Sequence, residues 1–562
     1  MDGIHPVVLR LLRSRGITDP QEISAFLHPS WDAGVHDPFL FSQMPKAVTR
    51  IFAALEKGEK ITVHGDYDAD GVTGSAVLIT TLREIEGKLG AEKSHIDFYI
   101  PHRDEEGYGL HPETVEALNK QGTNVIITVD CGIACVEEIE QAKAEGIDTI
   151  VVDHHQFGEK LPDAILIHPK LPGESYPFPH LAAVGVAWKL ACALVAEART
   201  RGLDIPDGWE KWLLDLVSIA TVTDMVPMVG ENRILELYGL KVLNKTRRPG
   251  LKALITLAGP KGELDSEFIG FGLGPRINAA GRMDHASLAL RCLLAGTDEE
   301  ANALAGEMER FNRDRQKASA KMLEEAEKKD ETGDKSIVVV WSEDWSPSLV
   351  GLVAGKLMDR TGKPCVAIGK FGDRWVGSGR SFAAYDITAA MRRAGEGILS
   401  HVGGHVQACG FSFPFDAPMS ELIERLYTDA ARELKDVELT PTLAVDAEVT
   451  LDLVSVGLAD ALSVLQPFGE GNRRPVFVSR NLEVVSADTV GQTQKHVRCV
   501  LKSPSGFHLS KFIGFNKLKV AGALDELPLQ VGQRVDVAYD IGINEWNGRR
   551  EVQCKLIDIR EA

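Results

Sequence analysis

The sequence lacks the features of a secreted, disulfide-linked or membrane-spanning protein. Its eight cysteines form no paired CxxC modules, which argues against a disulfide framework or a zinc ribbon and favours reduced thiols. The longest apolar segment, residues 181–196, is interrupted by Lys189 and is too short to cross a bilayer. The first residues, MDGIHPVVLRLLRSRG, show no basic-then-apolar pattern of a signal peptide. We therefore expect a cytoplasmic protein with no membrane association.

Several common catalytic motifs are also missing. The chain contains no Walker loop and no HExxH motif, and the glycines at 270, 272 and 274 do not follow a strand, so a nucleotide-cofactor fold is unsupported. The formal net charge of −19 argues against nonspecific nucleic-acid binding by bulk electrostatics, although it leaves room for a basic channel on one face. At 562 residues the chain is too long for a single core, so several domains are expected.

The hydrophobic pattern divides the chain into five segments and predicts an α/β multidomain protein. Strand-like runs alternate with helices from Pro45 to roughly Pro227, which is typical of βαβ units and a parallel sheet. Thr297 and Glu300 form a capping-box pattern at the start of a long polar helix. The predicted segments are an N-terminal helical segment 1–45, a parallel-sheet domain 46–296, a long connecting helix 297–330, a smaller α/β domain 331–438 and a C-terminal OB-like β-barrel 439–562.

Acidic and imidazole side chains follow four apolar runs in the first half of the chain. The sequence HGDYDADG at 64–71 comes directly after a short apolar run, and Asp130, the DHH sequence at 153–155 and Asp224 each follow another. In a parallel sheet, ligands bind beyond the carboxyl ends of the strands, so residues far apart in sequence can converge there. Carboxylate oxygens and imidazole nitrogens are suitable ligands for a two-metal hydrolytic centre.

These motifs resemble the first four motifs of the DHH phosphoesterase superfamily. Further along, GPRINAAGRMDHAS, GSGRS and GGHVQACG resemble motifs of the accessory DHHA1 domain, and PFGEGNRRPVF at 467–477 resembles the start of an OB-type domain. The motifs agree in identity and order with the single-strand-specific 5′→3′ exonucleases of that superfamily, except that Cys409 stands where relatives often have alanine. The resemblance implies a parallel-sheet DHH domain, a DHHA1-like domain and an OB-like domain.

The resemblance also implies which side chains hold two divalent ions. Asp130 would bridge the ions and hold them about 3.5–4 Å apart. The ions would be Mn²⁺, with Mg²⁺ as the alternative, because mixed oxygen-rich sites suit both. The implied ligands are His64, Asp68 and Asp130 for one ion, and Asp70, Asp130, His154 and Asp224 for the other.

Further residues are implied to act beside the two ions. A water between the ions would lose its proton near neutral pH and attack phosphorus in line. His155 would contact the scissile phosphate, while Asp153 and Asp66 would orient the imidazoles or organise the turn. The predicted catalytic residues are therefore Asp130, His155 and Asp153.

Basic residues in the second half of the chain are predicted to bind the substrate. Arg282, Arg380 and His405 are interpreted as lying in Gly-rich turns, and the resemblance makes Arg282, Ser378 and Arg380 candidates for the phosphate at the 5′ end. The alternative is that these segments form tight turns with exposed arginines. In the OB-like segment, basic residues with interleaved aromatics are typical of a single-strand groove. They are Arg473, Arg474, Lys495, Arg498, Lys511, Lys517 and Lys519, with Phe507, Phe512, Phe515 and Trp546, half of these aromatics being expected in the barrel core.

The sequence therefore predicts a divalent-metal-dependent exonuclease that hydrolyses single-stranded DNA from the 5′ end to mononucleotides. The alternative is a DHH-family phosphodiesterase acting on short oligonucleotides or cyclic dinucleotides, which would share the metal site but need no OB-like domain. The resemblance implies roles in recombinational DNA repair and mismatch repair, beside a single-strand-binding protein and a RecQ-type helicase. It also implies a monomer.

Overall fold

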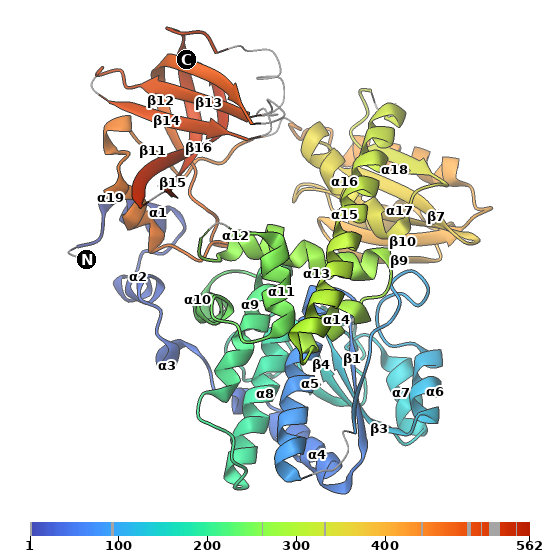
Figure 1. Cartoon of the computed structure of the whole chain (residues 1–562). Helices are drawn as coiled ribbons and strands as arrows, with labels where there is room; N and C mark the ends of the chain where they lie inside the picture. The colour runs from blue at the N-terminus through green and yellow to red at the C-terminus, as the bar shows by residue number, and fades with distance from the viewer. Residues whose placement is uncertain are drawn as a thin grey trace. The chain divides into compact units, whose positions relative to one another are not determined.

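The strand–helix alternation in the first half of the chain forms a five-stranded parallel sheet, as the sequence predicts (Figure 1). All neighbouring strands pair in parallel, in the order β2-β1-β3-β4-β5, so their carboxyl ends meet at one edge of the sheet. The strands are β1 (Lys60–Gly65), β2 (Ile96–Tyr99), β3 (Thr123–Val129), β4 (Asp148–Val152) and β5 (Ile165–Ile167).

This sheet belongs to the first of two units in the chain. The computed structural model describes residues 3–90, 95–260, 262–330, 333–439, 442–491, 496–506, 508–515, 529–546 and 548–562. The first unit comprises Pro29–Lys317 and Pro467–Arg473. The second unit comprises Met1–His28, Ala318–Gln466 and Arg474–Ala562.

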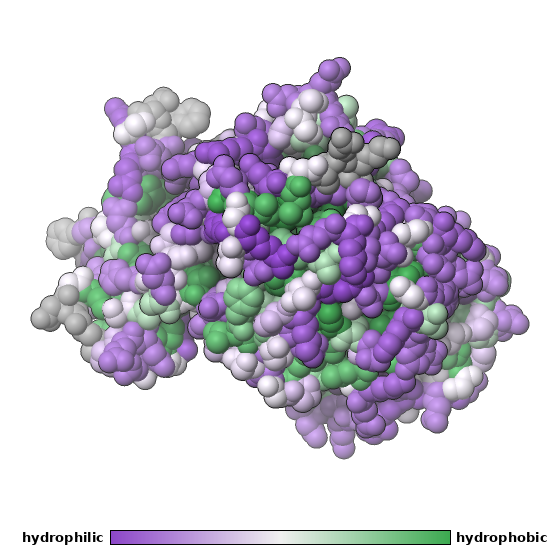
Figure 2. Space-filling view, turned by 90° about the horizontal axis from the view of Figure 1, so that it is seen from below, coloured by the Kyte–Doolittle hydropathy of each residue, from purple (hydrophilic) through white to green (hydrophobic). Residues whose placement is uncertain are grey.

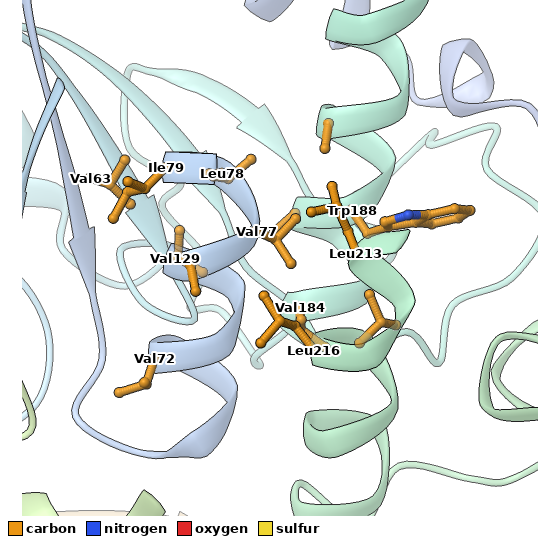
Figure 3. Packing of buried hydrophobic residues seen from close by; sticks show 14 of the residues in the cluster. Val63, Val72, Val77, Leu78, Ile79, Val129, Val184, Trp188, Leu213 and Leu216 are labelled. Atoms are coloured by element: carbon orange, nitrogen blue, oxygen red, sulfur yellow. The ribbon is translucent and has the colours of Figure 1, made fainter. Parts of the chain in front are cut away.

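Helices cover both faces of the parallel sheet. Alternate residues of β3 face opposite sides: Val125 and Ile127 belong to the buried cluster that includes α5 and α8, whereas Ile126 belongs to the cluster that includes α6 and α7. Figure 3 shows the first cluster, where Val77 of α5 lies between the sheet and the side chain of Val184 on α8. The helices are α5 (Ala69–Leu89), α6 (Pro112–Lys120), α7 (Val136–Ala144), α8 (Ala183–Thr200) and α9 (Leu214–Thr223).

The chain after α9 is mostly helical. The last helix of this series, α15, begins one residue after Thr297, whose hydroxyl accepts a hydrogen bond from the Glu300 N–H at 3.2 Å. Its 32 residues correspond to about 48 Å of helix. The helices are α10 (Gly230–Leu243), α11 (Pro249–Ala258), α12 (Ser266–Phe268), α13 (Gly274–Met283), α14 (Ser287–Leu294) and α15 (Asp298–Lys329), with a π-helix at Ile269–Leu273.

A short segment from the distant C-terminal half completes the first unit. Residues 467–473 pack on the loop that follows α9, where the Met228 N–H donates to the Glu470 carbonyl at 2.6 Å. The Ser266 hydroxyl donates to the Phe468 carbonyl at 2.6 Å. A Cβ on Gly471 would touch Pro227 at 3.4 Å, so the backbones of the two segments approach closely.

The second unit contains a mixed five-stranded sheet in the order β6-β7-β8-β10-β9. The sequence GSGRS, interpreted as a turn, is instead largely strand, because residues 377–380 end β8 and pair with both β7 and β10. The strands are β6 (Val338–Ser342), β7 (Cys365–Phe371), β8 (Arg374–Arg380), β9 (His401–His405) and β10 (Ala408–Pro414), with helices α16 (Pro347–Thr361), α17 (Ile387–Ala394) and α18 (Met419–Glu433).

The C-terminal segment forms the predicted β-barrel. A six-stranded sheet in the order β11-β12-β13-β14-β16-β15 is closed by an additional pairing of β12 with β15. Phe477, Phe512 and Tyr539 are buried inside it. The elements are β11 (Ala447–Glu448), α19 (Val456–Ser463), β12 (Phe477–Val490), β13 (His496–Lys502), β14 (Leu509–Gly514), β15 (Arg534–Trp546) and β16 (Arg549–Glu561).

The N-terminal segment divides between the two units. Its first helices belong to the second unit, where Arg15 lies 3.7 Å from Asp446 beside β11. From Pro29 onward the chain belongs to the first unit. The helices are α1 (Pro6–Ser14), α2 (Pro20–Leu27), α3 (Trp31–Gly34) and α4 (Met44–Lys57).

Hydrophilic residues cover much of the face shown in Figure 2, with hydrophobic residues between them. Among the helices that the structure describes, none has the length and apolar character needed to cross a bilayer.

Candidate metal centre

The turn after β1 and the start of α5 present three aspartates at the carboxyl edge of the sheet. Asp66 follows the strand, Asp68 caps the helix by accepting N–H groups of Asp70 and Gly71 at 2.8 and 3.2 Å, and Asp70 lies in the first helical turn. A Cβ on Gly71 would overlap the backbone of Asp66, so glycine is required for this tight turn. The DYDADG sequence therefore places three carboxylates together.

Asp70 is held in place by the start of α8. Its two carboxylate oxygens accept the N–H groups of Ala183 and Val184, each at 2.8 Å. The positive end of a helix stabilises a carboxylate, and here two otherwise unpaired amides also fix its orientation. Asp70 is completely enclosed, with 1% of its surface exposed.

Asp130 follows β3 in a left-handed backbone conformation. Its φ of 63° is uncommon for a residue other than glycine, and such strain accumulates at functional sites. Its N–H donates to the Val152 carbonyl at 3.0 Å, and its carbonyl accepts the Tyr108 hydroxyl at 2.8 Å. These two hydrogen bonds hold the backbone while the side chain projects into the cluster of carboxylates.

Asp153 organises the two histidines that follow it. One carboxylate oxygen accepts the His154 N–H at 2.7 Å, the His155 N–H at 3.1 Å and the His155 ring Nδ1 at 2.9 Å. The other oxygen accepts the Ile133 N–H at 3.1 Å. Burial alone would raise the pKa of Asp153, but these hydrogen bonds and the charge of His155 lower it to about 2.

The two histidines have opposite protonation behaviour. Burial lowers the pKa of His154 to about 3, with the charge of His155 adding to the effect, so this ring is neutral and available as a ligand. Burial also disfavours charge on His155, but the hydrogen bond and charge of Asp153 raise its pKa to about 9. His155 is therefore a cation at neutral pH. The Tyr108 hydroxyl lies 3.1 Å from its Nδ1.

Ligand atoms from these separate segments converge into three groups. The groups are Asp66, Asp68 and Asp130; Asp70, His154 and Asp224; and Asp130, His154 and His155, with the ligand atoms of each group all within 4.8 Å of one another. His154 Nε2 lies 3.4 Å from Asp130 Oδ1, 3.5 Å from Asp224 Oδ2 and 3.9 Å from Asp70 Oδ2. Asp224 comes from the C-terminal end of α9, whereas the other ligands come from strand ends or the adjoining turn.

Buried polar atoms without partners fit a cation at this centre. Among the described residues, Asp66 Oδ1, Asp130 Oδ1, His154 Nε2 and Asp224 Oδ2 are all enclosed and accept or donate no hydrogen bond. Buried polar atoms are normally paired, and four such atoms in one cluster are expensive in the absence of a bound ion. Carboxylates with one imidazole are a donor set for a hard divalent ion.

The mutual repulsion of the carboxylates appears in their pKa values. Burial, followed by the charge of Asp68, raises the pKa of Asp66 to about 8 and that of Asp70 to about 7. Burial and the neighbouring carboxylates raise the pKa values of Asp130 and Asp224 well above their usual range. A divalent ion would reverse these shifts by favouring the ionised forms.

The metal-free protein should therefore lose thermal stability as pH rises from about 4 to 8. Asp66 and Asp70 have folded-state pKa values of about 8 and 7, above the unfolded value of about 4, so their stabilising contribution is complete below pH 4 and is lost through these pKa values. Saturating Mg²⁺ should remove this decline. Tm measured across this pH range in EDTA and in Mg²⁺ checks it, and an equal decline in both would contradict it.

His64 is not part of these three groups, although the resemblance implies that it is a ligand. The residue is fully buried, its Nδ1 lies 3.6 Å from Cys131 Sγ, and its ring stacks on Tyr99 with centroids 5.5 Å apart. Burial lowers its pKa to about 4. One group places Asp66 with Asp68 and Asp130, and His64 Nε2 is, like Asp66 Oδ1, enclosed without a hydrogen-bond partner among the described residues. The alternating Asp-x-Asp-x-Asp spacing is the signal in the sequence for Asp66 as a further candidate ligand.

Arg282 lies beside the metal-binding turn, but on a helix. The predicted Gly-rich turn is α13, and Arg282 is in its last helical turn. The helix packs closely on the 66–70 turn, because Asn278 Oδ1 accepts the Ala69 N–H at 2.8 Å and a Cβ on Gly281 would lie 2.9 Å from the Tyr67 carbonyl. The glycine allows close packing of the helix rather than a turn.

Ser378 and Arg380 form a small polar group in the second unit, on strand β8 rather than in a turn. Arg380 Nη1 donates to the Ser378 hydroxyl at 2.6 Å and to the Gly379 carbonyl at 2.8 Å. Burial lowers the pKa of Arg380. No carboxylate pairs with this guanidinium in the part of the chain that the structure describes. His405 likewise ends strand β9 and has an exposed side chain.

The predicted nucleic-acid residues near the barrel have different surroundings. Arg473 is 78% exposed beside Glu470 at 3.3 Å, and Arg474 lies 3.9 Å from Asp540. Phe512 is core, whereas Phe515 is 47% exposed. Arg498 and Lys511 lie 3.6 Å from Asp488 and 3.4 Å from Glu551, respectively. Lys495, Phe507, Lys517, Lys519 and the side chain of Trp546 lie outside the described residues.

A parallel sheet that presents this cluster of aspartates and histidines, followed by a second α/β domain, defines a DHH-type phosphoesterase. Residues 60–221 match the family described as DHH family, N-terminal domain, residues 333–434 match the DHHA1 domain, and residues 445–558 match the RecJ OB domain. The chain belongs to the RecJ family of single-stranded-DNA-specific exonucleases. This finding confirms the resemblance inferred from the motifs.

Relatives and solved structures match nearly the whole chain. The single-stranded-DNA-specific exonuclease RecJ of Bacillus subtilis (strain 168) is 38% identical over 99% of this chain and 68% of its own length. The protein of the same description from Escherichia coli (strain K12) is 33% identical over 99% of this chain and 96% of its own length. The crystal structure of RecJ with Mn²⁺ from Thermus thermophilus is 28% identical, with a TM-score of 0.80 over 100% of this chain and 76% of that one.

Proposed function

We propose that this chain is a divalent-metal-dependent exonuclease that hydrolyses single-stranded DNA from the 5′ end to mononucleotides. The observation that carries the proposal is the convergence of Asp66, Asp68 and Asp130 with Asp70, His154 and Asp224 at one edge of the sheet. The relatives named single-stranded-DNA-specific exonucleases support this substrate. The barrel also favours a polymer over short oligonucleotides or cyclic dinucleotides, since such substrates need no OB-like domain.

Two divalent ions fit the cluster. We assign Asp66, Asp68 and Asp130 to one ion, and Asp130 with Asp70, His154 and Asp224 to the other, so that Asp130 is shared. This assignment replaces the implied His64 with Asp66. Similar RecJ structures from Thermus thermophilus are complexes with Mn²⁺ and with Mg²⁺, which supports either ion here. The imidazole among the oxygen ligands favours Mn²⁺.

The chain's own residues prepare the site for hydrolysis. When bound, the two ions would supply an activated water and stabilise charge on the scissile phosphate. Asp153 holds His155 in its protonated form, and this cation lies 3.6 Å from Asp130 Oδ1. An imidazolium at this position can donate to a phosphate oxygen as negative charge develops. Tyr108 hydrogen-bonds both the Asp130 carbonyl and His155, so it fixes the two relative to each other.

Binding of the DNA strand is assigned to basic residues outside the cluster. Arg282, Ser378, Arg380 and His405 are proposed to bind the phosphate at the 5′ end, and Arg473 with Arg474 to bind the strand. The half-buried Arg380 supports this role, because a guanidinium paired only with neutral groups is suited to a phosphate. Binding of the terminal phosphate would restrict hydrolysis to one end.

We also propose the cellular context that the family implies. The chain would act as a monomer in recombinational DNA repair and mismatch repair, beside a single-strand-binding protein and a RecQ-type helicase. We place the activity in the cytoplasm, the reducing compartment in which eight free cysteines are expected.

Degradation of a single-stranded DNA of roughly 40 nucleotides, labelled at either end in separate reactions, tests this function. With Mn²⁺, the 5′ label should appear at once as a mononucleotide, the 3′-labelled strand should shorten gradually, and a blunt duplex should survive. Immediate release of the 3′ label would contradict the proposed 5′→3′ direction of hydrolysis. Cleavage of only di- or trinucleotides or cyclic dinucleotides would agree with the proposed metal centre but would contradict a polymer as the substrate.

A further inference from the structure

An open surface pocket of about 480 Å³ lies in the first unit, apart from the metal centre. Its walls come from α5, the residues before α9, the start of α11 and the end of α14. Its volume falls in the range of small-molecule sites, about 300–1,000 Å³. We call it the arginine–tryptophan pocket, after its lining residues Arg83, Trp209, Trp212, Arg247 and Arg248.

The pocket and the metal centre share one helix. Asp70 lies in the first turn of α5, and Thr80, which lines the pocket, is ten residues further along the same helix. At 1.5 Å per residue the two positions are about 15 Å apart along the helix axis. A ligand in the pocket would therefore contact the helix that presents Asp68 and Asp70 without reaching those residues.

One arginine of the pocket is built into its wall. Arg248 Nε donates to Asp215 Oδ1 at 3.2 Å, and its Nη1 lies 3.4 Å from the Thr80 hydroxyl. The other oxygen of the buried Asp215 accepts the Thr246 hydroxyl at 2.7 Å. Both oxygens of this carboxylate therefore accept hydrogen bonds from the pocket wall, and one of them is paired with Arg248. It does not repel an anion in the pocket as a free carboxylate would.

The two other arginines have no such partner. Neither Arg83 nor Arg247 forms an ion pair with a carboxylate within the described ranges of the chain. The only other acidic lining residue is Glu84, which lies 3.9 Å from Lys88. The pocket thus presents an excess of positive charge in a chain whose net charge is −19. Two guanidinium groups at one cavity are suited to a phosphate.

Aromatic rings complete the lining. The Arg247 guanidinium stacks over the Trp212 ring, 3.7 Å from its centroid, and Trp212 is 37% exposed. Trp209 lies in the same short helix, Trp209–Leu213. Nucleobases stack on tryptophan and on arginine planes regardless of their identity.

We propose that the arginine–tryptophan pocket is a second nucleotide-binding site, which takes a nucleoside 5′-phosphate unit away from the metal centre. Arg83 and Arg247 would bind the phosphate, and Trp212 would stack on the base. The unit can be a free mononucleotide, the product of the proposed reaction, or one nucleotide of a DNA strand, because both present the same base and phosphate. Binding itself does not depend on hydrolysis, so the site stands independently of the proposed function.

Isothermal titration of the full chain in EDTA with dAMP tests the site. All variants are made in an Arg380→Ala background, so that the proposed 5′-phosphate pocket does not contribute. One dAMP should bind per chain, and Arg247→Ala and Trp212→Ala should each weaken binding at least about tenfold, about 1.4 kcal/mol. Arg201→Ala is the matched control: Arg201 also stacks on an aromatic ring, 4.2 Å from the Phe52 centroid, but lies outside the pocket. It should leave the affinity unchanged.

Four further probes identify the ligand. If inorganic phosphate binds as tightly as dAMP and Trp212→Ala has no effect, the pocket is only an anion site and the nucleotide assignment is overturned. If short oligodeoxythymidylate binds much more tightly than dTMP in an Arg247-dependent manner, the unit belongs to a strand. Absence of nucleotide binding, or Arg247-dependent binding of an acidic peptide in its place, also overturns the proposal.

In the Arg380-containing chain, Arg247→Ala should leave the rate at saturating single-stranded DNA within about twofold of wild type.

Discussion

Replacing Asp130 with asparagine should reduce the rate of single-stranded DNA hydrolysis by about 1,000-fold or more, about 4 kcal/mol of transition-state stabilisation. Asp130 is the shared carboxylate of the proposed two-ion centre, and its Oδ1 has no hydrogen-bond partner among the described residues. The amide removes the negative charge that both ions need. Raising the Mn²⁺ concentration should not restore the rate.

The same substitution should leave the metal-free protein equally stable or more stable. Asparagine tolerates the φ of 63° at this position better than most residues, and it removes one of several mutually repelling carboxylates. The Tm in EDTA should therefore be unchanged or higher. Asp130→Ala is a poorer variant, because alanine adopts a left-handed backbone less readily.

A control substitution separates the effect of charge at the site from that of charge in general. Asp19→Asn removes one carboxylate from the N-terminus of α2 and retains the cap, since asparagine caps as well as aspartate. It should change neither the rate nor the metal-free Tm. A near-normal rate for Asp130→Asn would contradict the shared ligand, and a lower Tm in EDTA would contradict repulsion in the metal-free cluster.

Asp66→Asn should remove one of the two bound ions and reduce the rate by at least about 100-fold, about 2.7 kcal/mol. The reason is geometric: Asp66 Oδ1 is enclosed, unpaired among the described residues, and grouped with Asp68 and Asp130. Titration with Mn²⁺ should give one ion per chain in place of two. The loss should persist at saturating DNA, because the substitution does not touch the proposed substrate residues.

The variant His64→Gln, compared with Asp66→Asn, tests which of the two residues is a metal ligand. His64 is outside the three groups of proposed ligands, its Nδ1 lies beside Cys131 and its ring stacks on Tyr99, so the glutamine should retain two ions and at least about a tenth of the rate. Its Tm should fall, because a buried stacked ring is lost. Loss of one ion in His64→Gln, with two ions retained in Asp66→Asn, would return the ligand role to His64.

The parallel sheet and the position of most candidate ligands follow from the sequence pattern. Apolar strands alternating with helices determine parallel pairing, and an acidic residue directly after such a strand is placed at the carboxyl edge. Asp130 and His154 are predicted in this way, and both lie in the cluster. The pattern does not distinguish His64 from Asp66 as the proposed ligand, because their positions depend on how the chain turns after β1. The overlap of a Cβ on Gly71 with the Asp66 backbone shows how tightly this turn closes, and the hydrophobic pattern does not contain that geometry.

The Gly-rich segments are the main source of error in the sequence prediction. Glycine disfavours helices and strands, so the pattern around Arg282 and Arg380 predicts turns. Both segments are regular structure, and their glycines serve close contacts instead. A Cβ on Gly281 would lie 2.9 Å from the Tyr67 carbonyl, and one on Gly379 would lie 2.7 Å from Cys409 Sγ. Local propensity does not contain this information, because the contacting residues are far away in the sequence.

The packing of residues 467–473 on the loop after α9 affects how the role of the barrel can be studied. A shortened protein that ends before Pro467 would lose the barrel, and with it the carbonyls that accept hydrogen bonds from Met228 and Ser266. Because Met228 follows the ligand Asp224 by four residues, such a deletion would disturb the metal centre as well as DNA binding. Its low activity could then be attributed to the wrong part of the molecule. Substitutions on the barrel surface avoid this ambiguity.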